Sequence, residues 1–517
     1  MFSKLSHFAG GSTGYTWLSR SLARKALTAG LLILLAACGG GGGGGAPSTD
    51  QNATQMLGSS GLNYAAAASP STDGDAYRFL TQATFGPTPD DVARVKTIGY
   101  ARWIDEQWGL RLQASHLASV EGSASTLQTG HPRAEDVGFS WWTHAVRDPA
   151  QLRQRVAFAL SEIFVVSVTT LENGRNVASY MDMLTEHADG SFRDLLEAVA
   201  LHPAMGQYLS HMTNRKEDQT TGRVPDENFA REVMQLFSIG LYSLDDAGKP
   251  VLANNQPIET YTASDIKGLA RVFTGLSWYR PPSKSGLDWF RCFWRAADCQ
   301  DTAQDVTAMG YYTEAHEQGA KSFLGISLQA QSNASPATDI SAALDRLAAH
   351  PNTAPFISKQ LIQRLVTSNP SDGYVSDITQ VFRSTNGNLG AVIKAILLHA
   401  EARTVPSNTR AQYGKLREPV LRLTHLLRAI PHNSDRYNAN QQAGAMPFYM
   451  VDDTSDPGTA LGQSPMKAPS VFNFFRPGYV PPQTEFSASG LVAPEMQITN
   501  ETSVLGYANF MAATLND

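Results

Sequence analysis

The chain has 517 residues, of which 42% are apolar and 17% charged, so it can bury a large core and wholesale disorder is disfavoured. Its 41 basic and 47 acidic side chains disfavour a nucleic-acid-binding protein, because such proteins need a basic excess. Its three cysteines exclude a cysteine-rich scaffold, an iron–sulfur protein and a four-cysteine zinc site within one chain.

The first 37 residues have the features of an export signal. Residues 4–25 contain four Lys or Arg and no acid, and an apolar run follows that is too short for a bilayer, which needs about 20 residues. The run ends in Leu35-Ala36-Ala37-Cys38, which resembles the lipobox of bacterial lipoproteins. This resemblance implies cleavage before Cys38, acylation of Cys38 and a place in the bacterial cell envelope, at the outer membrane. The alternative is an ordinary secretory signal in which Cys38 is incidental.

Residues 38–74 are expected to form a tether. Seven consecutive glycines follow Cys38, and Ser, Thr, Ala and Asn predominate after them. A flexible linker of this length would hold a domain on the order of 30 Å from a membrane anchor. Removal of residues 1–37 would take away four cations and no carboxylate, which changes the net charge from −6 to −10. The predicted organisation is therefore a signal (1–37), a tether (38–74) and one large domain (75–517).

The domain has a predominantly helical pattern. Residues 151–168 are apolar nearly all round, which predicts a helix buried at the centre of the domain. Ser191 and Thr262 stand where helix N-caps are expected, each with an Asp three residues later. Further helices are predicted over 340–350, 353–367, 377–384 and 389–399.

Signals for β-strands are few. Residues 251–252 and 258–261 could form one small hairpin, and the chain after about residue 430 is irregular and rich in proline. The predicted fold class is mainly α: one multi-helix domain with an irregular Pro-rich C-terminal region and at most a small β-hairpin.

Residues 279–312 are rich in Pro, Ser and aromatic side chains and read as a surface excursion. The excursion contains Cys292 and Cys299, for which an oxidising compartment predicts a disulfide. Closing so small a loop would contribute about 2.5 kcal/mol in the chain-entropy model. Its aromatic side chains either form a local core or present a surface that stacks on sugars or contacts a partner.

Six segments together resemble one bacterial family, known as domain of unknown function 1800. They are RFLTQATFGPT (78–88), LRQRVAFALSEIFVVS (152–167), DENFAREVMQLFSIGLY (226–242), YTASDIKGLARVFTG (261–275), LAAHPNTAPFISKQLIQRLV (347–366) and APSVFNFFRPGY (468–479). The resemblance implies an exported, mostly helical protein, often encoded beside an exported protein with an alkaline-phosphatase-like fold. It implies no particular reaction and no known cofactor.

The densest polar cluster of the chain lies at residues 226–235. Asn228, Arg231 and Glu232 share one side of a predicted helix with Gln235. Such a cluster is a solvated face, a buried structural network or a functional site in which a carboxylate, an amide and a guanidinium bind a ligand together. In the functional interpretation Glu232 would be an acid or base, and Asn228 and Arg231 would position the substrate.

Histidines give a second candidate. His187, His202 and His211 lie within twenty-five residues of one another and close in sequence to the polar cluster. A single histidine is usually a satisfied core or surface residue, but His187 or His202 could converge on Glu232 as a metal ligand or second proton carrier.

Glu162 is a third candidate, because it interrupts the most apolar predicted helix. If it is buried it needs a partner from another segment or a raised pKa, and it is then either structural or a catalytic carboxylate; otherwise it is exposed. Two functions follow from these candidates. The first is an accessory or partner-binding lipoprotein, and the alternative is an envelope hydrolase acting on polysaccharide or another polymer through the His/Glu/Asn/Arg cluster.

Overall fold

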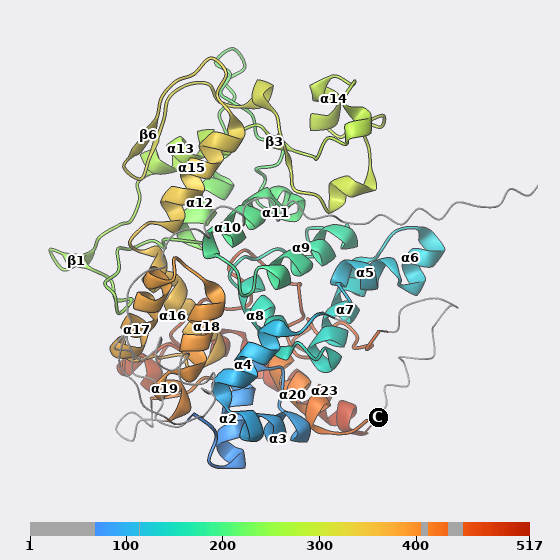
Figure 1. Ribbon diagram of the computed structural model, residues 1–517, viewed down its shortest axis with the longest axis vertical. Helices are drawn as coiled ribbons and strands as arrows, with labels where there is room; N and C mark the ends of the chain where they lie inside the picture. The colour runs from blue at the N-terminus through green and yellow to red at the C-terminus, as the bar shows by residue number, and fades with distance from the viewer. Residues whose placement is uncertain (1–67, 113, 405–411, 433–447, 517) are drawn as a thin grey trace, which may run out of the picture. The chain divides into compact units, whose positions relative to one another are not determined.

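The computed structural model describes residues 68–112, 114–404, 412–432 and 448–516 (Figure 1). The predicted signal, Cys38 and nearly all of the predicted tether lie outside this part of the chain. The described residues are mainly α-helical and carry only short antiparallel strand pairs, so the predicted fold class is confirmed. Within these ranges no helix is both long enough and apolar enough to cross a membrane.

The first half of the domain is a succession of short and medium helices. They are α2 (Asp73–Ala83), α3 (Pro89–Ile98), α4 (Tyr100–Gly109), α5 (His116–Glu121), α6 (Ala124–Thr129), α7 (Ala134–Arg147), α8 (Gln151–Ser161), α9 (Gly174–Glu186), α10 (Phe192–Leu201), α11 (Pro203–Tyr208) and α12 (Asn228–Gln235).

The second half combines helices with the few strands. Its helices are α13 (Ala263–Val272), α14 (Trp289–Phe293), α15 (Pro336–Ala348), α16 (Thr353–Leu365), α17 (Asp372–Ser384), α18 (Leu389–Leu398), α19 (Ala400–Arg403), α20 (Pro419–Ala429), α22 (Glu485–Ala488) and α23 (Glu501–Asn516). Short 3₁₀ turns lie at Pro282–Lys284, Thr302–Asp305, Thr313–Ala315 and Pro494–Ile498.

Helix α8 lies among α4, α9 and α16, and nearly all of its side chains are buried. In Figure 1, α16 runs beside α17 and α18, and these helices pack against one another. The prediction of a helix through residue 168 is wrong, because α8 ends at Ser161 and Glu162 is its C-cap. Beyond a turn at Phe164 the chain leaves the helix, and Val168 donates its N–H to the carbonyl of Met466 (2.9 Å). The run stays apolar because it stays buried, and burial alone does not distinguish helix from extended chain.

Both predicted N-caps are confirmed. Ser191 accepts a hydrogen bond from the N–H of Asp194 at the start of α10. Thr262 and Asp265 form a reciprocal capping box at the start of α13. These caps satisfy backbone donors that the first helical turn leaves without partners.

A hairpin is present where one was predicted, as β1 (Leu252–Ala253) paired with β2 (Gln256–Pro257), but the predicted strand bounds of 251–252 and 258–261 are wrong, because the pairing continues into the predicted loop. Its two-residue turn is Asn254-Asn255, with φ of 52° and 61°, a conformation that asparagine tolerates better than most residues. The structure adds two further antiparallel pairs. They are β3 (Leu276–Ser277) with β4 (Gly310–Tyr311), and β5 (Lys321–Phe323) with β6 (Ile326–Leu328).

The excursion at 279–312 has its own small core. Cys292 and Cys299 form the predicted disulfide and are fully buried. They pack with Phe293 and Tyr312, whose rings meet edge to face at a centroid distance of 5.2 Å. This packing agrees with a local core for the loop, although Phe290 and Trp294 remain 49% and 42% exposed.

The disulfide predicts the outcome of a thiol titration. Unfolded but unreduced mature protein should show no free thiol at positions 292 and 299, because both sulfur atoms are engaged in one bond. The measurement is labelling with a thiol reagent in denaturant followed by peptide mass spectrometry. Reduction before labelling is the control and should reveal both sites. Labelling of either cysteine without reduction would contradict the structure.

Candidate functional site

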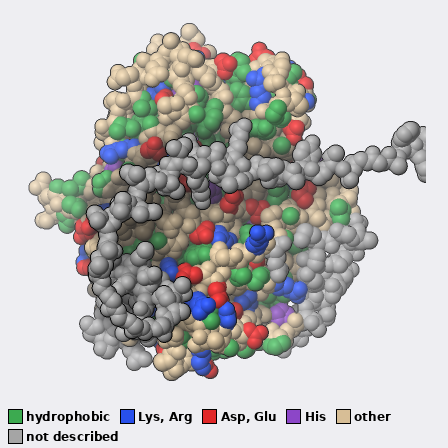
Figure 2. All heavy atoms as spheres, viewed as in Figure 1, with side chains coloured by type: hydrophobic (Ala, Val, Ile, Leu, Met, Phe, Trp, Pro, Cys, Tyr) green, Lys and Arg blue, Asp and Glu red, His purple; other side chains and the backbone are tan. Residues whose placement is uncertain are grey.

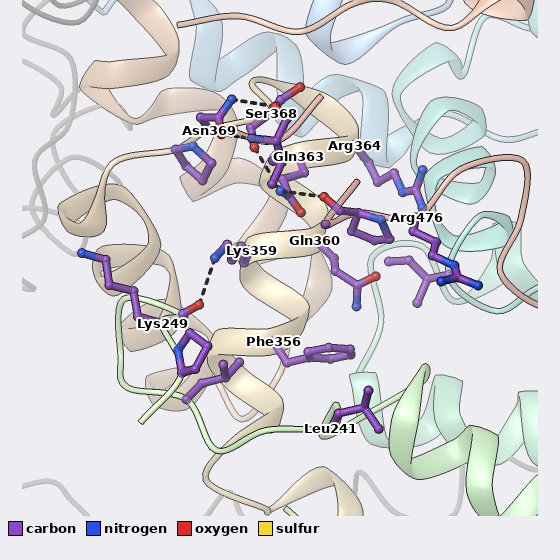
Figure 3. Close-up of a pocket in the computed structure, with 18 of the residues that line it drawn as sticks. Leu241, Lys249, Phe356, Lys359, Gln360, Gln363, Arg364, Ser368, Asn369 and Arg476 are labelled. Carbon is purple, nitrogen blue, oxygen red and sulfur yellow. Dashed lines mark hydrogen bonds between the residues drawn. The ribbon is translucent and has the colours of Figure 1, made fainter. Parts of the chain in front are cut away.

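A cavity of about 740 Å³ lies along one face of α16. Its wall also includes Glu162 and Ile163 after α8, the chain that follows α12 as far as Pro250, and two C-terminal segments, 471–478 and 490–492. A volume of this size is typical of pockets for small-molecule ligands. The side chains of α16 and of the facing loops are drawn in Figure 3.

Helix α16 supplies five residues of the wall. Phe356, Lys359, Gln360, Gln363 and Arg364 all line the cavity, and their spacing of three and four residues places them on one helical face. The apolar residues between them are buried in the core. Polar side chains therefore line the cavity while the rest of the helix anchors the wall.

The mouth of the cavity is built by the turn after α12. Gly240 has φ of 71°, and a Cβ there would lie 2.7 Å from the ring of Phe356, so only glycine fits. Asn352 holds the same turn from the start of α16. Its amide donates to the carbonyls of Ile239 and Tyr242, both at 2.7 Å, and its side-chain oxygen accepts from the N–H of Leu244 (2.7 Å).

The C-terminal region completes the wall. Asn369 exchanges two hydrogen bonds of 2.9 Å with the backbone of Val492. Gln363 donates to the carbonyls of Ser368 (3.0 Å) and Pro477 (3.4 Å) (Figure 3). The irregular segments are therefore tied to α16 and to the residues that follow it.

Glu162 meets Arg364 at the inner end of the cavity. The two side chains are each 4% exposed, and Nη1 of Arg364 lies 3.4 Å from Oε1 of Glu162. The same Oε1 accepts a hydrogen bond of 3.1 Å from Asn473 in the C-terminal region. Of the possibilities drawn from the sequence, the structure therefore agrees with a buried Glu162. Its partner comes from another segment of the chain.

This pair belongs to a larger buried ionic cluster. We use this name for four cations and three carboxyl groups that influence one another electrostatically: Arg155, Arg364, Lys415 and Arg417, with Glu162, Glu418 and Glu495. Lys415 pairs with Glu495 at 2.8 Å, and Gln463 donates to Glu418 at 2.7 Å.

The ionic cluster shifts the pKa values of Glu162 and Glu418 in opposite directions. Burial, followed by the charge of Glu418 and a hydrogen bond to it, raises the pKa of Glu162 to about 8, although Arg364 opposes the shift. Burial also acts to raise the pKa of Glu418, but Lys415 and the hydrogen bond with Glu162 outweigh it and hold that pKa below its usual value. Burial and the opposite pKa shifts therefore favour the proton on Glu162 rather than on Glu418, to which Glu162 is hydrogen bonded.

Two buried donor atoms on the cavity wall have no hydrogen-bond partner: Nε2 of Gln360 and Nη1 of Arg364. We call Gln360 and Arg364, together with neighbouring Glu162, the polar floor. A buried donor or acceptor that makes no hydrogen bond costs about 1–3 kcal/mol. Such groups at the inner end of an open cavity are the atoms that a bound molecule would satisfy.

The polar cluster predicted around α12 lies elsewhere. Asn228 and Arg231 are exposed, and Arg231 contacts Glu227 at 3.4 Å. Glu232 is only 8% exposed, its Oε2 has no hydrogen-bond partner, and burial raises its pKa against the opposing charge of Arg231. Of this helix only Gln235, at its C-terminal end, lines the cavity.

The three histidines serve local structure. His202 caps α11 by accepting from the N–H of Ala204 (3.2 Å), and burial lowers its pKa to about 3. His211 contacts the carbonyl of Ala200 (2.8 Å), while half-buried His187 caps the end of α9. No hydrogen bond or ion pair among the described residues joins Glu232 to His187 or His202, so their catalytic role stays a prediction. In the same part of the chain, no three His, Cys, Asp or Glu side chains group so that they could hold a metal ion.

The described residues form a mainly helical domain with a cavity of mixed polar and apolar lining along α16. The profile of a family described as "Protein of unknown function (DUF1800)" matches residues 78–516, and the chain belongs to this family. No curated protein matches the chain. No solved structure matches it either.

The raised pKa of Glu162 gives a pH test of the site. In the unfolded chain this carboxyl group loses its proton near pH 4.5, whereas the folded protein keeps the proton up to about pH 8. The folded state therefore binds more protons between these values, and the wild type loses stability as the pH rises through this window. Glu162→Gln keeps the shape and removes this titration. We expect the melting temperature of the variant to rise relative to wild type from pH 5 to 8 and the difference to level off above.

The control for this test is Glu485→Gln, which changes an exposed carboxylate in α22. Its difference from wild type should vary little with pH. A difference between Glu162→Gln and wild type that stays constant from pH 5 to 9 would show that Glu162 titrates normally.

Proposed function

We propose that this protein is an envelope lipoprotein with an accessory, partner-binding role, and that its helical domain holds a ligand or a segment of the partner in the cavity along α16. The observation that carries the proposal is the polar floor: Gln360 and Arg364 line an open cavity, and each has a buried donor atom without a hydrogen-bond partner.

The segments that resemble the family support this proposal. Four of the six, those at 152–167, 226–242, 347–366 and 468–479, contribute side chains to the cavity wall, and they supply more than half of its residues. Segments more than 300 residues apart in sequence thus meet around one cavity. This convergence favours a role for the cavity throughout the family.

Binding is favoured over hydrolysis by the Glu232 cluster because its members do not line one pocket. Asn228 and Arg231 face solvent, and none of the five predicted catalytic residues belongs to the cavity wall. The proposed partners are the membrane, through a lipid on Cys38, and an exported alkaline-phosphatase-like protein encoded nearby. Nucleic acid is not proposed, since the mature chain would carry a net charge of −10. Acidic and basic side chains are interspersed on the described part of the face in Figure 2.

Filling the mouth of the cavity tests the proposal. Leu241 lines the cavity and is 46% exposed, so Leu241→Trp should obstruct the cavity with little effect on folding. We expect the wild-type protein, purified from its own envelope in mild detergent, to retain a stoichiometric ligand or partner. Leu241→Trp should lose most of it, as measured by native mass spectrometry.

The matched control is Leu252→Trp, which places the same side chain on the exposed hairpin strand β1, outside the cavity wall. This variant should behave as wild type. If both variants keep the bound molecule, or if the wild type carries nothing, the cavity is not the binding site.

The lipid anchor is tested separately. Cys38→Ala removes the only proposed acylation site, so the protein should move from the membrane pellet to the soluble fraction. Fractionation of cells followed by immunoblotting measures the change, with Cys292→Ala as a control that leaves Cys38 intact. Continued association of the Cys38→Ala protein with membranes would refute lipid anchoring.

A further inference from the structure

The polar floor offers donors rather than acceptors to a ligand. Nε2 of Gln360 and Nη1 of Arg364 are donor atoms without hydrogen-bond partners, and their residues are 8% and 4% exposed. Nη1 of Arg364 lies near Glu162 but does not hydrogen bond to it. Two buried donors next to a cavity select a ligand group that accepts hydrogen bonds.

The charge at this end of the cavity is positive. The ionic cluster contains four cations and three carboxyl groups, so one positive charge is left over even when all three carboxyl groups are ionised. A proton on Glu162 raises the excess to two. Arg476, drawn beside the polar floor in Figure 3, is exposed and adds another cation to the wall. An anion is the charge that would balance this excess in a low-dielectric site.

The other charged side chains of the wall are already engaged. Lys249 pairs with Asp372, and Lys359 donates to the carbonyl of Gly248 at 2.9 Å. Arg364 is paired with Glu162 at 3.4 Å. The exposed guanidinium of Arg476, which lies over the ring of Phe472 at 4.4 Å, is therefore the cation of the wall most open to an anionic group.

The remainder of the wall is apolar. Leu241 and Phe356 lie together at the end of the drawn cavity away from Arg364 (Figure 3). The wall further includes Ile163, Leu236, Leu244, Val471, Phe472 and Leu491. An inorganic anion or a sugar would leave this surface without contacts, whereas an aliphatic chain would cover it.

We propose that the cavity binds an amphipathic organic acid of the medium-chain fatty acid class, with its carboxylate on Gln360, Arg364 and Arg476 and its aliphatic chain along Phe356 and Leu241. This inference rests on the proposed function and names the chemistry of the ligand. The carboxylate accepts hydrogen bonds from Nε2 of Gln360 and Nη1 of Arg364, which make none within the protein. Its negative charge offsets the excess of cations.

Calorimetric titration of the purified full chain carrying Cys38→Ala tests the inference at pH 7. The probes are decanoate, decanol and decyltrimethylammonium, each below its micellar concentration. Decanoate should bind at least about tenfold more tightly than decanol, because one charge-assisted hydrogen bond is worth about that factor. The cationic probe should not bind detectably.

Two variants locate the carboxylate. Arg476→Gln removes an exposed charge and should leave the melting temperature unchanged. Gln360→Leu replaces a buried amide with an apolar side chain of similar size. Each should weaken decanoate binding about tenfold and leave decanol binding unchanged. Arg94→Gln, an exposed arginine in α3 outside the cavity wall, is the control and should not alter either affinity.

Equal affinity for decanoate and decanol, or decanoate binding that neither cavity variant changes, would overturn the inference. Failure of the inference can be distinguished from failure of the proposed function. If decanoate does not bind while Leu241→Trp still loses the retained ligand or partner, the cavity binds another class of molecule and the proposed function stands.

Discussion

The burial of charge beside the cavity is the constraint on which the rest of this structure depends. Arg155 and Arg364 are almost completely removed from solvent, and an isolated buried charge is strongly unfavourable. Carboxyl groups from three distant parts of the chain surround them: Glu162 after α8, Glu418 before α20 and Glu495 near the C-terminus. The central helices and the C-terminal region are thereby obliged to meet at one place. Removing any one of these groups would leave its partners buried and uncompensated.

The cavity is a consequence of this meeting. Helix α16 inserts an apolar face into the core and turns its polar face toward Glu162 and the C-terminal segments, and the cavity lies along that polar face. The wall is then fixed by specific contacts: Gly240 admits the ring of Phe356, Asn352 holds the turn after α12, and Asn369 holds Val492. A pocket defined by so many directional contacts is largely preformed, which favours binding because little order must be gained when a ligand enters.

Much of the fold was predictable because local chemistry determines it. The caps at Ser191 and Thr262, the hairpin near Asn254 and the disulfide between Cys292 and Cys299 each depend on residues close in sequence. The buried state of Glu162 was one of the anticipated possibilities, but Arg364 could not be identified as its partner, since 202 residues separate them. A usable signal for the cavity did exist: Lys359, Gln360, Gln363 and Arg364 recur at helical spacing within an otherwise apolar run. The polar residues of α12 drew attention instead because they are denser along the chain, although most of them face solvent.

The wall contributed by residues 471–478 and 490–492 has a consequence for the order in which the protein matures. An exported chain that crosses the membrane from its N-terminus delivers α8 and α16 before these residues. The face of α16 that lines the cavity is then uncovered at first, and Glu162 lacks Asn473, which lies 311 residues further along the chain. Contacts of such long sequence separation form late and slowly in folding. Ligand-binding capacity would then be the last property that the domain acquires and the first that it loses when the C-terminus is clipped. Occupancy of the cavity would thus indicate that residues 471–492 have reached their place against α16.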